Sequence, residues 1–201
     1  EVATLSHENV STGLTMVALA GINDPPRPEA IASIKACHAA GIRVKMITGD
    51  SQVTAEAIGR ELGLDADKVL SGSDLDKLDD EALADVAEQV HIYARTSPAN
   101  KLALVKSLRS RNHVVAMTGD GVNDAPALRQ ADIGVAMGMK GTDAAREASD
   151  IVLTDDQFST IALAVLEGRT VYDNIMKSIL FILPTSLAEA VVIITAIIMG
   201  T

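Results

Sequence analysis

The chain has 201 residues, which is enough for one domain of ordinary size with a real core. Its formal net charge of −10 argues against a nucleic-acid partner, because such a partner requires a basic face. Its residues are 48% hydrophobic but only 2% aromatic, so the core is built from Ala, Val, Ile and Leu, as in parallel strands wrapped by helices. The single cysteine, Cys37, can form neither an internal disulfide nor a zinc cluster, and it indicates a reducing compartment.

The first expected elements are a strand and a helix separated by a rigid connector. Residues 15–22 predict a strand, which the Pro25-Pro26 pair ends because proline cannot continue a ladder. Pro28 then begins a helix that ends near Gly41.

A second buried strand is predicted at residues 44–47, and it leads directly into the tripeptide Thr48-Gly49-Asp50. A helix follows, in which Ala57, Ile58 and Leu62 share one face and Gly63 ends the helix. The Thr48 hydroxyl and the backbone N–H groups beside it are suited to a phosphate oxygen.

The middle of the chain predicts an acidic solvated helix, a short strand and a well-marked helix start. The acidic stretch is residues 74–88, in which the cluster at 79–81 fits a helix start better than a site. A strand is expected at 91–94, and Ser97-Pro98 begin the next helix. Lys101 lies in the first turn of that helix, against the helix dipole. That placement is explained if Lys101 faces a phosphate; alternatively it is an ordinary surface lysine.

The most informative segment is residues 118–126, which follow an apolar strand predicted at 114–117. Asp120 and Asp124 lie four residues apart with Asn123 between them, where a strand ends and a helix begins. These oxygens suit Mg²⁺ held beside a phosphate; the alternative is an acidic loop that caps a helix. Because the Thr-Gly-Asp sequence occurs twice after a strand, we expect both loops at one end of a parallel sheet, where α/β proteins bind ligands.

The carboxyl-terminal part predicts two short strands, at 132–136 and 150–153, and then one long helix. Helical periodicity starts at Phe158 and continues into an apolar run at 179–199, long enough to cross a bilayer. The alternative is a buried hydrophobic helix, but little of this chain is left to cover one. Arg169 and Lys177 on the amino side of the run predict that the globular part is cytoplasmic.

These residues resemble the P-type cation-transporting ATPases, a branch of the haloacid dehalogenase superfamily. The resemblance covers nearly the whole chain. Its motifs, in chain order, are residues 24–27 (DPPR), 46–50 (MITGD), 97–98 with Lys101, 118–128 (TGDGVNDAPAL) and 155–158 (DDQF). It implies a Rossmannoid parallel sheet flanked by helices and followed by one transmembrane helix. The implied parts are the end of the nucleotide domain with its entry strand (1–23), the second half of the phosphorylation domain (24–157), a stalk helix (158–178) and a truncated transmembrane helix (179–201).

The resemblance also implies roles for individual residues. Asp120 would bind the catalytic Mg²⁺, and Asn123 and Asp124 would support it. Thr48 and Gly49 would hold the phosphoryl group that Lys101 neutralises, while Asp50 and Arg95 would face ATP. Residues 24–27 would form one strand of the hinge to the nucleotide domain. Glu189 stands where pumps for Ca²⁺, or for Na⁺ and K⁺, place a cation-binding carboxylate, and an ionisable group at that depth is usually functional.

One departure is decisive: the family's nucleophile belongs to an Asp-Lys-Thr-Gly-Thr motif, which this sequence lacks. We therefore expect the chain alone to be inactive, with the rest of the pump, the transported cation and membrane lipid as its partners. Ser186 stands where relatives often carry Asn, which leaves the identity of the ion open. Two other interpretations stay open, namely a soluble haloacid dehalogenase phosphatase and a non-catalytic membrane-anchored relative.

Overall fold

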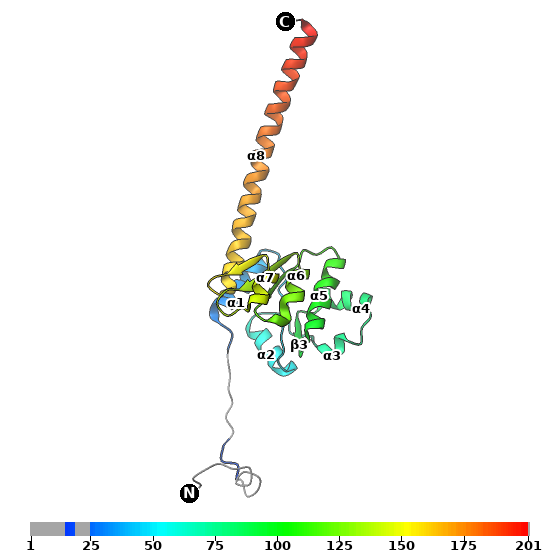
Figure 1. Ribbon diagram of the computed structural model, residues 1–201, viewed down its shortest axis with the longest axis vertical. Helices are drawn as coiled ribbons and strands as arrows, with labels where there is room; N and C mark the ends of the chain where they lie inside the picture. Colours follow the sequence, from blue (N-terminus) through cyan, green and yellow to red (C-terminus); the bar gives the residue numbers. More distant parts are fainter. Residues whose placement is uncertain (1–14, 19–24, 201) are drawn as a thin grey trace.

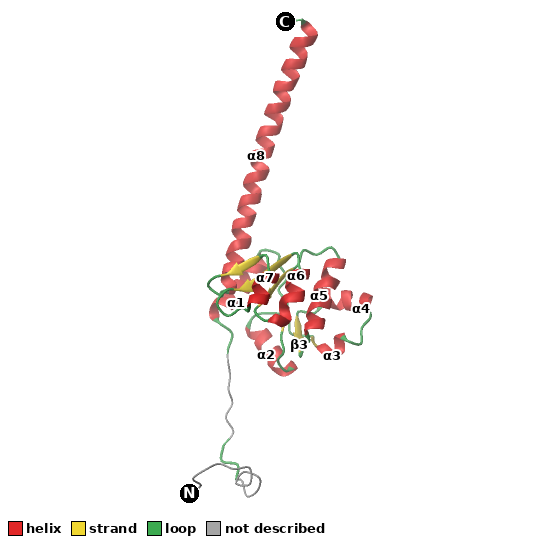
Figure 2. Ribbon diagram, viewed as in Figure 1, coloured by secondary structure: helices red, strands yellow, loops and turns green. Residues whose placement is uncertain are grey.

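The computed structural model describes residues 15–18 and 25–200. The described part folds into two small parallel sheets with helices around them, and one long helix leaves the domain (Figures 1 and 2). The strands are β1 (Met46–Ile47), β2 (Val69–Ser71), β3 (Ile92–Ala94), β4 (Ala116–Gly119), β5 (Ile133–Met137) and β6 (Ile151–Leu153). The helices are α1 (Pro28–Ala39), α2 (Gln52–Glu61), α3 (Gly72–Leu75), α4 (Asp80–Gln89), α5 (Pro98–Ser110), the 3-10 turn η2 (Val122–Asp124), α6 (Ala125–Gln130), α7 (Asp143–Ala148) and α8 (Phe158–Met199).

The first sheet has the strand order β1-β3-β2 and is packed on both faces. β3 is its centre, with Ile92 aligned to Met46 of β1 and to Val69 of β2. One face packs against α1 and α2 through a cluster that includes Ile34 and Ala55. The other face carries the buried Tyr93 and packs against α4 and α5. Apart from Tyr93, the buried side chains of this core are almost all aliphatic, as the composition predicts.

The second sheet has the order β4-β5-β6, and all three strands are parallel. Its buried cluster comes from α5, α6 and α7 and includes Val105, Leu128 and Ala145. Helix α5 therefore joins the two halves, because Leu104 packs on the first sheet while Val105 packs on the second.

The structure corrects several sequence-based expectations. One continuous sheet was expected, but among the described residues β1 and β4 belong to separate sheets. Residues 15–18 are not in a strand, and most of the predicted strand at 15–22 lies outside the described residues. Ala57 is exposed, because the buried face of α2 is formed by Ala55 and Gly59. Short elements without a clear apolar period, namely β2, α3 and α7, were not predicted.

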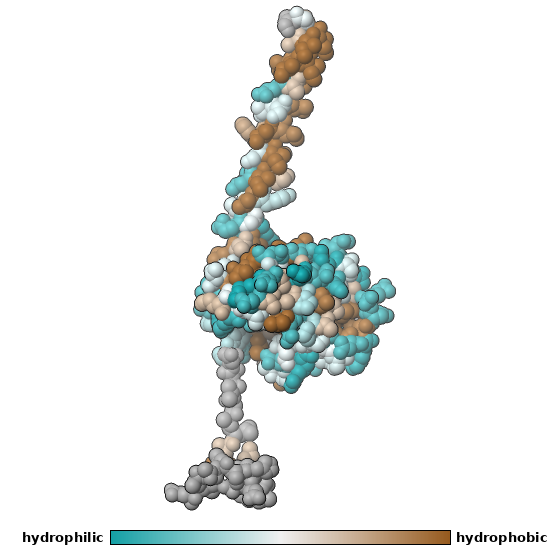
Figure 3. Space-filling model, viewed as in Figure 1, coloured by the Kyte–Doolittle hydropathy of each residue, from teal (hydrophilic) through white to brown (hydrophobic). Residues whose placement is uncertain are grey.

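Helix α8 is continuous over 42 residues, as its sequence predicts. Its distal half projects from the domain, on the side away from α2 and α3, and its exposed surface there is mostly apolar (Figures 1 and 3). It is the one described helix that is long and apolar enough to cross a membrane by length and composition.

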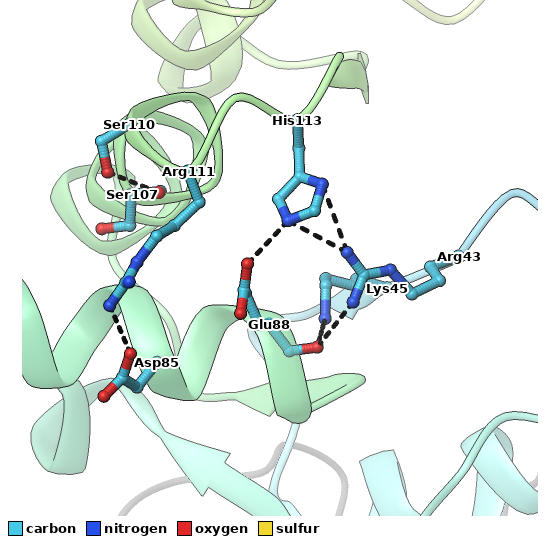
Figure 4. Close-up of polar contacts among 8 residues, drawn as sticks. All are labelled: Arg43, Lys45, Asp85, Glu88, Ser107, Ser110, Arg111 and His113. Carbon is cyan, nitrogen blue, oxygen red and sulfur yellow. Dashed lines mark hydrogen bonds and ion pairs between the residues drawn. The ribbon is translucent and has the colours of Figure 1, made fainter.

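A polar cluster ties together the amino-terminal ends of the strands (Figure 4). The carbonyl of Glu88 accepts hydrogen bonds from Arg43 and Lys45, each at 3.3 Å. The carboxylate of Glu88 contacts His113 at 2.8 Å, which lowers the Glu88 pKa. Lys45 also donates to the Val90 carbonyl at 2.6 Å, and partial burial together with nearby Arg43 lowers its pKa to about 8. These contacts fasten the strand ends opposite the predicted phosphate loops.

Candidate functional site

The first loop of the candidate site is Thr48-Gly49-Asp50, directly after β1. The Thr48 hydroxyl donates to the Asp50 carboxylate at 2.9 Å and accepts from the Asp50 N–H at 3.1 Å. Asp50 and Gly49 are exposed and Thr48 is half-buried. The loop thus presents one hydroxyl and one carboxylate at the carboxyl end of a parallel strand.

A second loop, directly after β3, holds the first one in place. The Arg95 N–H donates to the Asp50 carbonyl at 3.0 Å, and Thr96 donates to the Thr48 carbonyl through both its N–H and its hydroxyl. Arg95 has a φ of 50°, which is uncommon for a residue with a side chain. The Arg95 side chain is exposed.

Helix α5 begins in this second loop with a capping box that fixes its direction. Ser97 and Asn100 satisfy each other's backbone N–H groups through their side chains. Asn100 is 5% exposed and donates to the Asp76 carboxylate at 2.6 Å. Sequence reasoning identified Ser97 but missed Asn100, although the Ser-x-x-Asn spacing was a usable signal. Lys101 follows Asn100 directly and contacts the loop after β4.

Lys101 and Asp124 form the contact that joins the two halves of the site. The Lys101 ammonium lies 2.6 Å from the Asp124 carboxylate, with side-chain exposures of 21% and 8%. The two residues come from α5, which packs on both sheets, and from the turn after β4. Lys101 is therefore not an ordinary surface lysine: its charge is held at the carboxyl end of β4.

The loop after β4 is organised around Asp124. The second Asp124 oxygen accepts from the N–H groups of Asp120 and Gly121, at 3.4 and 3.3 Å. Gly119 allows this approach, because a Cβ there would lie 2.6 Å from the Asp124 Cβ. Asp124 is consequently turned inward, whereas the side chains of Asp120 and Asn123 are exposed.

The backbone of Asp120 is also held from outside its own loop. Its carbonyl accepts from the Thr142 N–H at 2.8 Å, and Thr142 is the N-cap of α7. The predicted metal residues therefore do not share one orientation: Asp120 offers a free carboxylate on a fixed backbone, while Asp124 is committed to Lys101. No group of three or more His, Cys, Asp or Glu side chains converges within the described residues.

Glu189 lies far from these loops, on the projecting part of α8. It is 31 residues beyond Phe158, which corresponds to about 47 Å of helix at 1.5 Å per residue. Pro184 lies inside the helix, and the Thr185 hydroxyl donates to the Phe181 carbonyl at 2.9 Å. The structure thus brings Lys101 and Asp124 together, joins Thr48 and Asp50 to the Arg95 loop, and keeps Glu189 apart.

The motif at 155–158 anchors the start of α8. The Asp156 carboxylate accepts from the N–H groups of Met139 and Lys140, and these bonds lower its pKa. Asp155 accepts from the Thr160 hydroxyl, which lowers its pKa in the same way. Phe158 packs into the core of the first sheet. We attribute this motif to the attachment of α8 rather than to chemistry.

The sequence profile of the haloacid dehalogenase-like hydrolases matches residues 3–132. The chain belongs to this family. Curated relatives include the cation-transporting ATPase pma1 of Synechocystis, 50% identical over 98% of this chain, and the probable cation-transporting ATPase F of Mycobacterium tuberculosis, 52% identical over 96%. The calcium-transporting ATPase 1 of Bacillus cereus is 49% identical over 96% of the chain. The chain spans 22% of the length of each of these relatives.

Solved structures of similar proteins agree with the sequence comparison. A zinc-transporting PIB-type ATPase in its E2·Pi state is 31% identical with a TM-score of 0.59, covering 78% of this chain and 21% of that one. The catalytic domain of the CPx-ATPase CopB-B is 26% identical with a TM-score of 0.52, covering 70% of this chain and 45% of that one. The resemblance to P-type cation-transporting ATPases and the parallel-sheet fold are therefore confirmed.

Proposed function

We propose that this chain is the second half of the phosphorylation domain of an ATP-driven cation pump, together with its stalk helix and part of one transmembrane helix. The observation that carries the proposal is the Lys101–Asp124 contact at 2.6 Å. It places a cation at the carboxyl end of β4, in the loop that contains Asp120, while the first Thr-Gly-Asp loop is hydrogen-bonded to Arg95 and Thr96, just before α5 begins. This arrangement suits a doubly charged phosphoryl group, because fixed donors and a lysine offset its charge.

The missing part of the pump has a place to dock, a slot between the two sheets. Among the described residues, β1 pairs only with β3 and β4 only with β5, so each has one edge without a ladder there. A cavity of about 270 Å³ lies there, and its lining includes Met46, Ile47, Thr118 and Phe158. An apolar strand inserted in parallel would join the two sheets and end beside both Thr-Gly-Asp loops. We assign this place to the strand that carries the aspartyl nucleophile in the missing half of the domain.

The metal of this site would be Mg²⁺, held by Asp120. A free carboxylate on a fixed backbone fits a hard cation, which prefers oxygen ligands and keeps several waters. Asp120 supplies one ligand, Asn123 can hold a bound water, and the nucleophile carboxylate would supply the next. Mg²⁺ bound there would offset phosphate charge during transfer. Asp124 supports the site indirectly, because it holds the loop backbone and orients Lys101.

The remaining candidate residues would bind either the phosphoryl group or the nucleotide. Thr48 and Gly49 would bind phosphoryl oxygens through the hydroxyl and the exposed backbone. Asp50 and Arg95 are exposed on adjoining loops and would face ATP. The chemistry would be attack by the absent aspartate on the terminal phosphate, followed by hydrolysis of the aspartyl phosphate. Without that carboxylate, the chain alone should not hydrolyse ATP.

Glu189 would be the cation ligand in the membrane. Pro184 cannot donate to the carbonyl one turn earlier, and Thr185 and Ser186 add hydroxyls nearby, so several oxygens can gather around one ion. The positive side chains on the amino side of the span favour a cytoplasmic position for the globular part. The partners would be the rest of the pump, the cation and lipid.

Two alternatives make different predictions. A soluble phosphatase would use the same Lys101 and Asp120, but it requires its own nucleophile, and a soluble protein would not expose a long apolar helix to water. A non-catalytic membrane-anchored relative would keep the fold and bind Mg²⁺ without turnover.

The test uses the full-length protein that contains this chain, incubated with ATP labelled on the terminal phosphate. We expect an acid-stable phosphoprotein in the unaltered protein and at least a hundredfold less in Asp120→Asn, because the metal is poorly held. Asp80→Asn serves as the control, since Asp80 is an exposed aspartate at the start of α4. Absence of a phosphoprotein from the unaltered full-length protein would refute the pump. Release of phosphate by the isolated chain, abolished by Asp120→Asn, would favour the phosphatase.

A further inference from the structure

Helix α8 is attached to the domain mainly through α1. The facing side chains are small or aliphatic: Ala36, Cys37 and Ala40 on one side and Ala162, Val165 and Leu166 on the other line a void of about 10 Å³. Cys37 and Ala162 are 4% and 9% exposed, so the two helices are in close contact. Beyond this interface α8 leaves the domain (Figure 1).

Arg169 closes this interface at the point where α8 departs. Its guanidinium donates to the Ala40 carbonyl at 2.6 Å, a contact between residues 129 positions apart in sequence. Ala40 is the C-cap of α1, and Gly41 follows with a φ of 75°. A cation at this end complements the α1 dipole and binds one of its unpaired carbonyls. Arg169 is itself exposed, so it adds little to the core.

The other end of α1 meets the phosphorylation site. Ala30 and Ile34 of α1 line the slot between β1 and β4, where we place the strand of the nucleophile. Before α1, the Pro25-Pro26-Arg27 connector leads toward the preceding part of the chain. Helix α1 therefore contacts the slot with its first two turns and α8 with its last turn.

We propose that Arg169 is a positioning residue for transport, which holds the carboxyl end of α1 on α8 and so links the state of the phosphorylation site to the direction of α8. This inference rests on the proposed pump function. A shift of the slot strand would move α1, and the Arg169–Ala40 bond would pass the shift to α8. Glu189 lies 20 residues beyond Arg169, about 30 Å along the helix. A small tilt of α8 at Arg169 therefore produces a larger displacement of Glu189.

The test separates phosphorylation from transport in the full-length protein, reconstituted in vesicles. The ion is whichever of Ca²⁺, Mn²⁺, Na⁺ or K⁺ stimulates ATP hydrolysis by the unaltered protein. We expect Arg169→Gln to keep its phosphoprotein level within twofold while ions taken up per ATP fall about tenfold. Arg169→Lys keeps a hydrogen-bond donor, so its ions taken up per ATP should fall only about threefold. The control is Lys177→Gln, which removes a charge from the same helix and should change neither value.

A covalent lock provides the second measurement. In Arg169→Gln, a cysteine placed at Ala162 or Val165 faces Cys37 across the interface. We expect oxidation to form a disulfide with Cys37 at one of these positions. The transport ratio, meaning ions taken up per ATP, should then recover to at least half of its value in the unaltered protein until reductant is added. A folding role for Arg169 would not be rescued in this way.

Several results would overturn the inference while the pump function stands. These are an unchanged transport ratio in Arg169→Gln, a parallel fall of phosphoprotein and transport, no disulfide to Cys37 at either position, or a disulfide without recovery. Failure of the unaltered protein to form a phosphoprotein, or to respond to any of the four ions, would instead remove the proposed function and this inference together.

Discussion

The Lys101–Asp124 pair should contribute to stability as well as to chemistry, and it can be tested on the chain itself. The variant Lys101→Met leaves the Asp124 carboxylate 8% exposed, with only two long backbone N–H bonds at 3.3 and 3.4 Å. Breaking a fully buried pair costs about 3–5 kcal/mol, whereas an exposed pair contributes about 0–1 kcal/mol. Lys101 is 21% exposed and partly screened, so we expect a loss of about 2 kcal/mol in the free energy of unfolding.

The unpaired negative charge of Asp124 should account for the stability lost in Lys101→Met. If Lys101→Met is harmful because it strands a buried carboxylate, neutralising Asp124 must relieve it. The double variant Lys101→Met with Asp124→Asn should therefore unfold with a free energy about 1 kcal/mol higher than Lys101→Met alone. Additive destabilisation by the two substitutions would show that the pair is not coupled.

The assay uses Tyr93 as its probe. The chain has two tyrosines and no tryptophan, and Tyr93 is fully buried in the core. In a Tyr172→Phe background, urea unfolding in detergent can be followed by the fluorescence of Tyr93 alone. Lys106→Met is the matched control, an exposed lysine on the same helix. Equal losses for Lys101→Met and Lys106→Met, within 0.5 kcal/mol or so, would refute the reasoning.

Three further predictions follow from individual groups. The folded-state pKa of Lys45 is about 8 against 10.5 unfolded, so the unfolded chain binds more protons in this interval. The free energy of unfolding, measured by urea titration, should therefore rise between pH 8 and 9.5, a range below that where Tyr93 titrates. Lys45→Met should flatten that rise. Mg²⁺ titration followed by NMR should shift the amides of 120–124 first; shifts centred on 79–81 would place the metal elsewhere. In the full-length protein, Glu189→Gln should greatly reduce ion-stimulated ATP hydrolysis while nucleotide binding persists; normal ion affinity would remove Glu189 from the site.

The sequence predicted what depends on local chemistry. The helix start at Ser97, a strand at each Thr-Gly-Asp sequence and the unbroken helix from Phe158 follow from caps, apolar runs and periodicity. The bounds of the second strand were wrong, because β4 begins at Ala116 instead of residue 114 and includes Thr118 and Gly119. It also showed that Lys101 lies against the helix dipole, but it left open that Lys101 is an ordinary surface lysine. These features are determined within a few neighbouring residues, so one sequence is sufficient to find them.

Other features depend on distant parts of the chain and were not predictable. The inward turn of Asp124 requires Lys101 from another helix and the space left by Gly119. The contact of Arg169 with Ala40 crosses 129 positions and has no local pattern. The separation of the two sheets was not expected either, because alternating strands and helices predict a parallel sheet without saying which strand joins its halves.

The two unpaired edges have a practical consequence for handling this chain. Within the part of the chain that the structure describes, one edge of β1 and one edge of β4 have no ladder partner, and both lie beside a largely apolar slot. Open edges of this kind pair readily with other chains. Expressed alone, the chain should therefore self-associate even after the apolar end of α8 is removed. A soluble form would need the slot filled, and fusing an apolar strand ahead of the chain is the most direct way to obtain it.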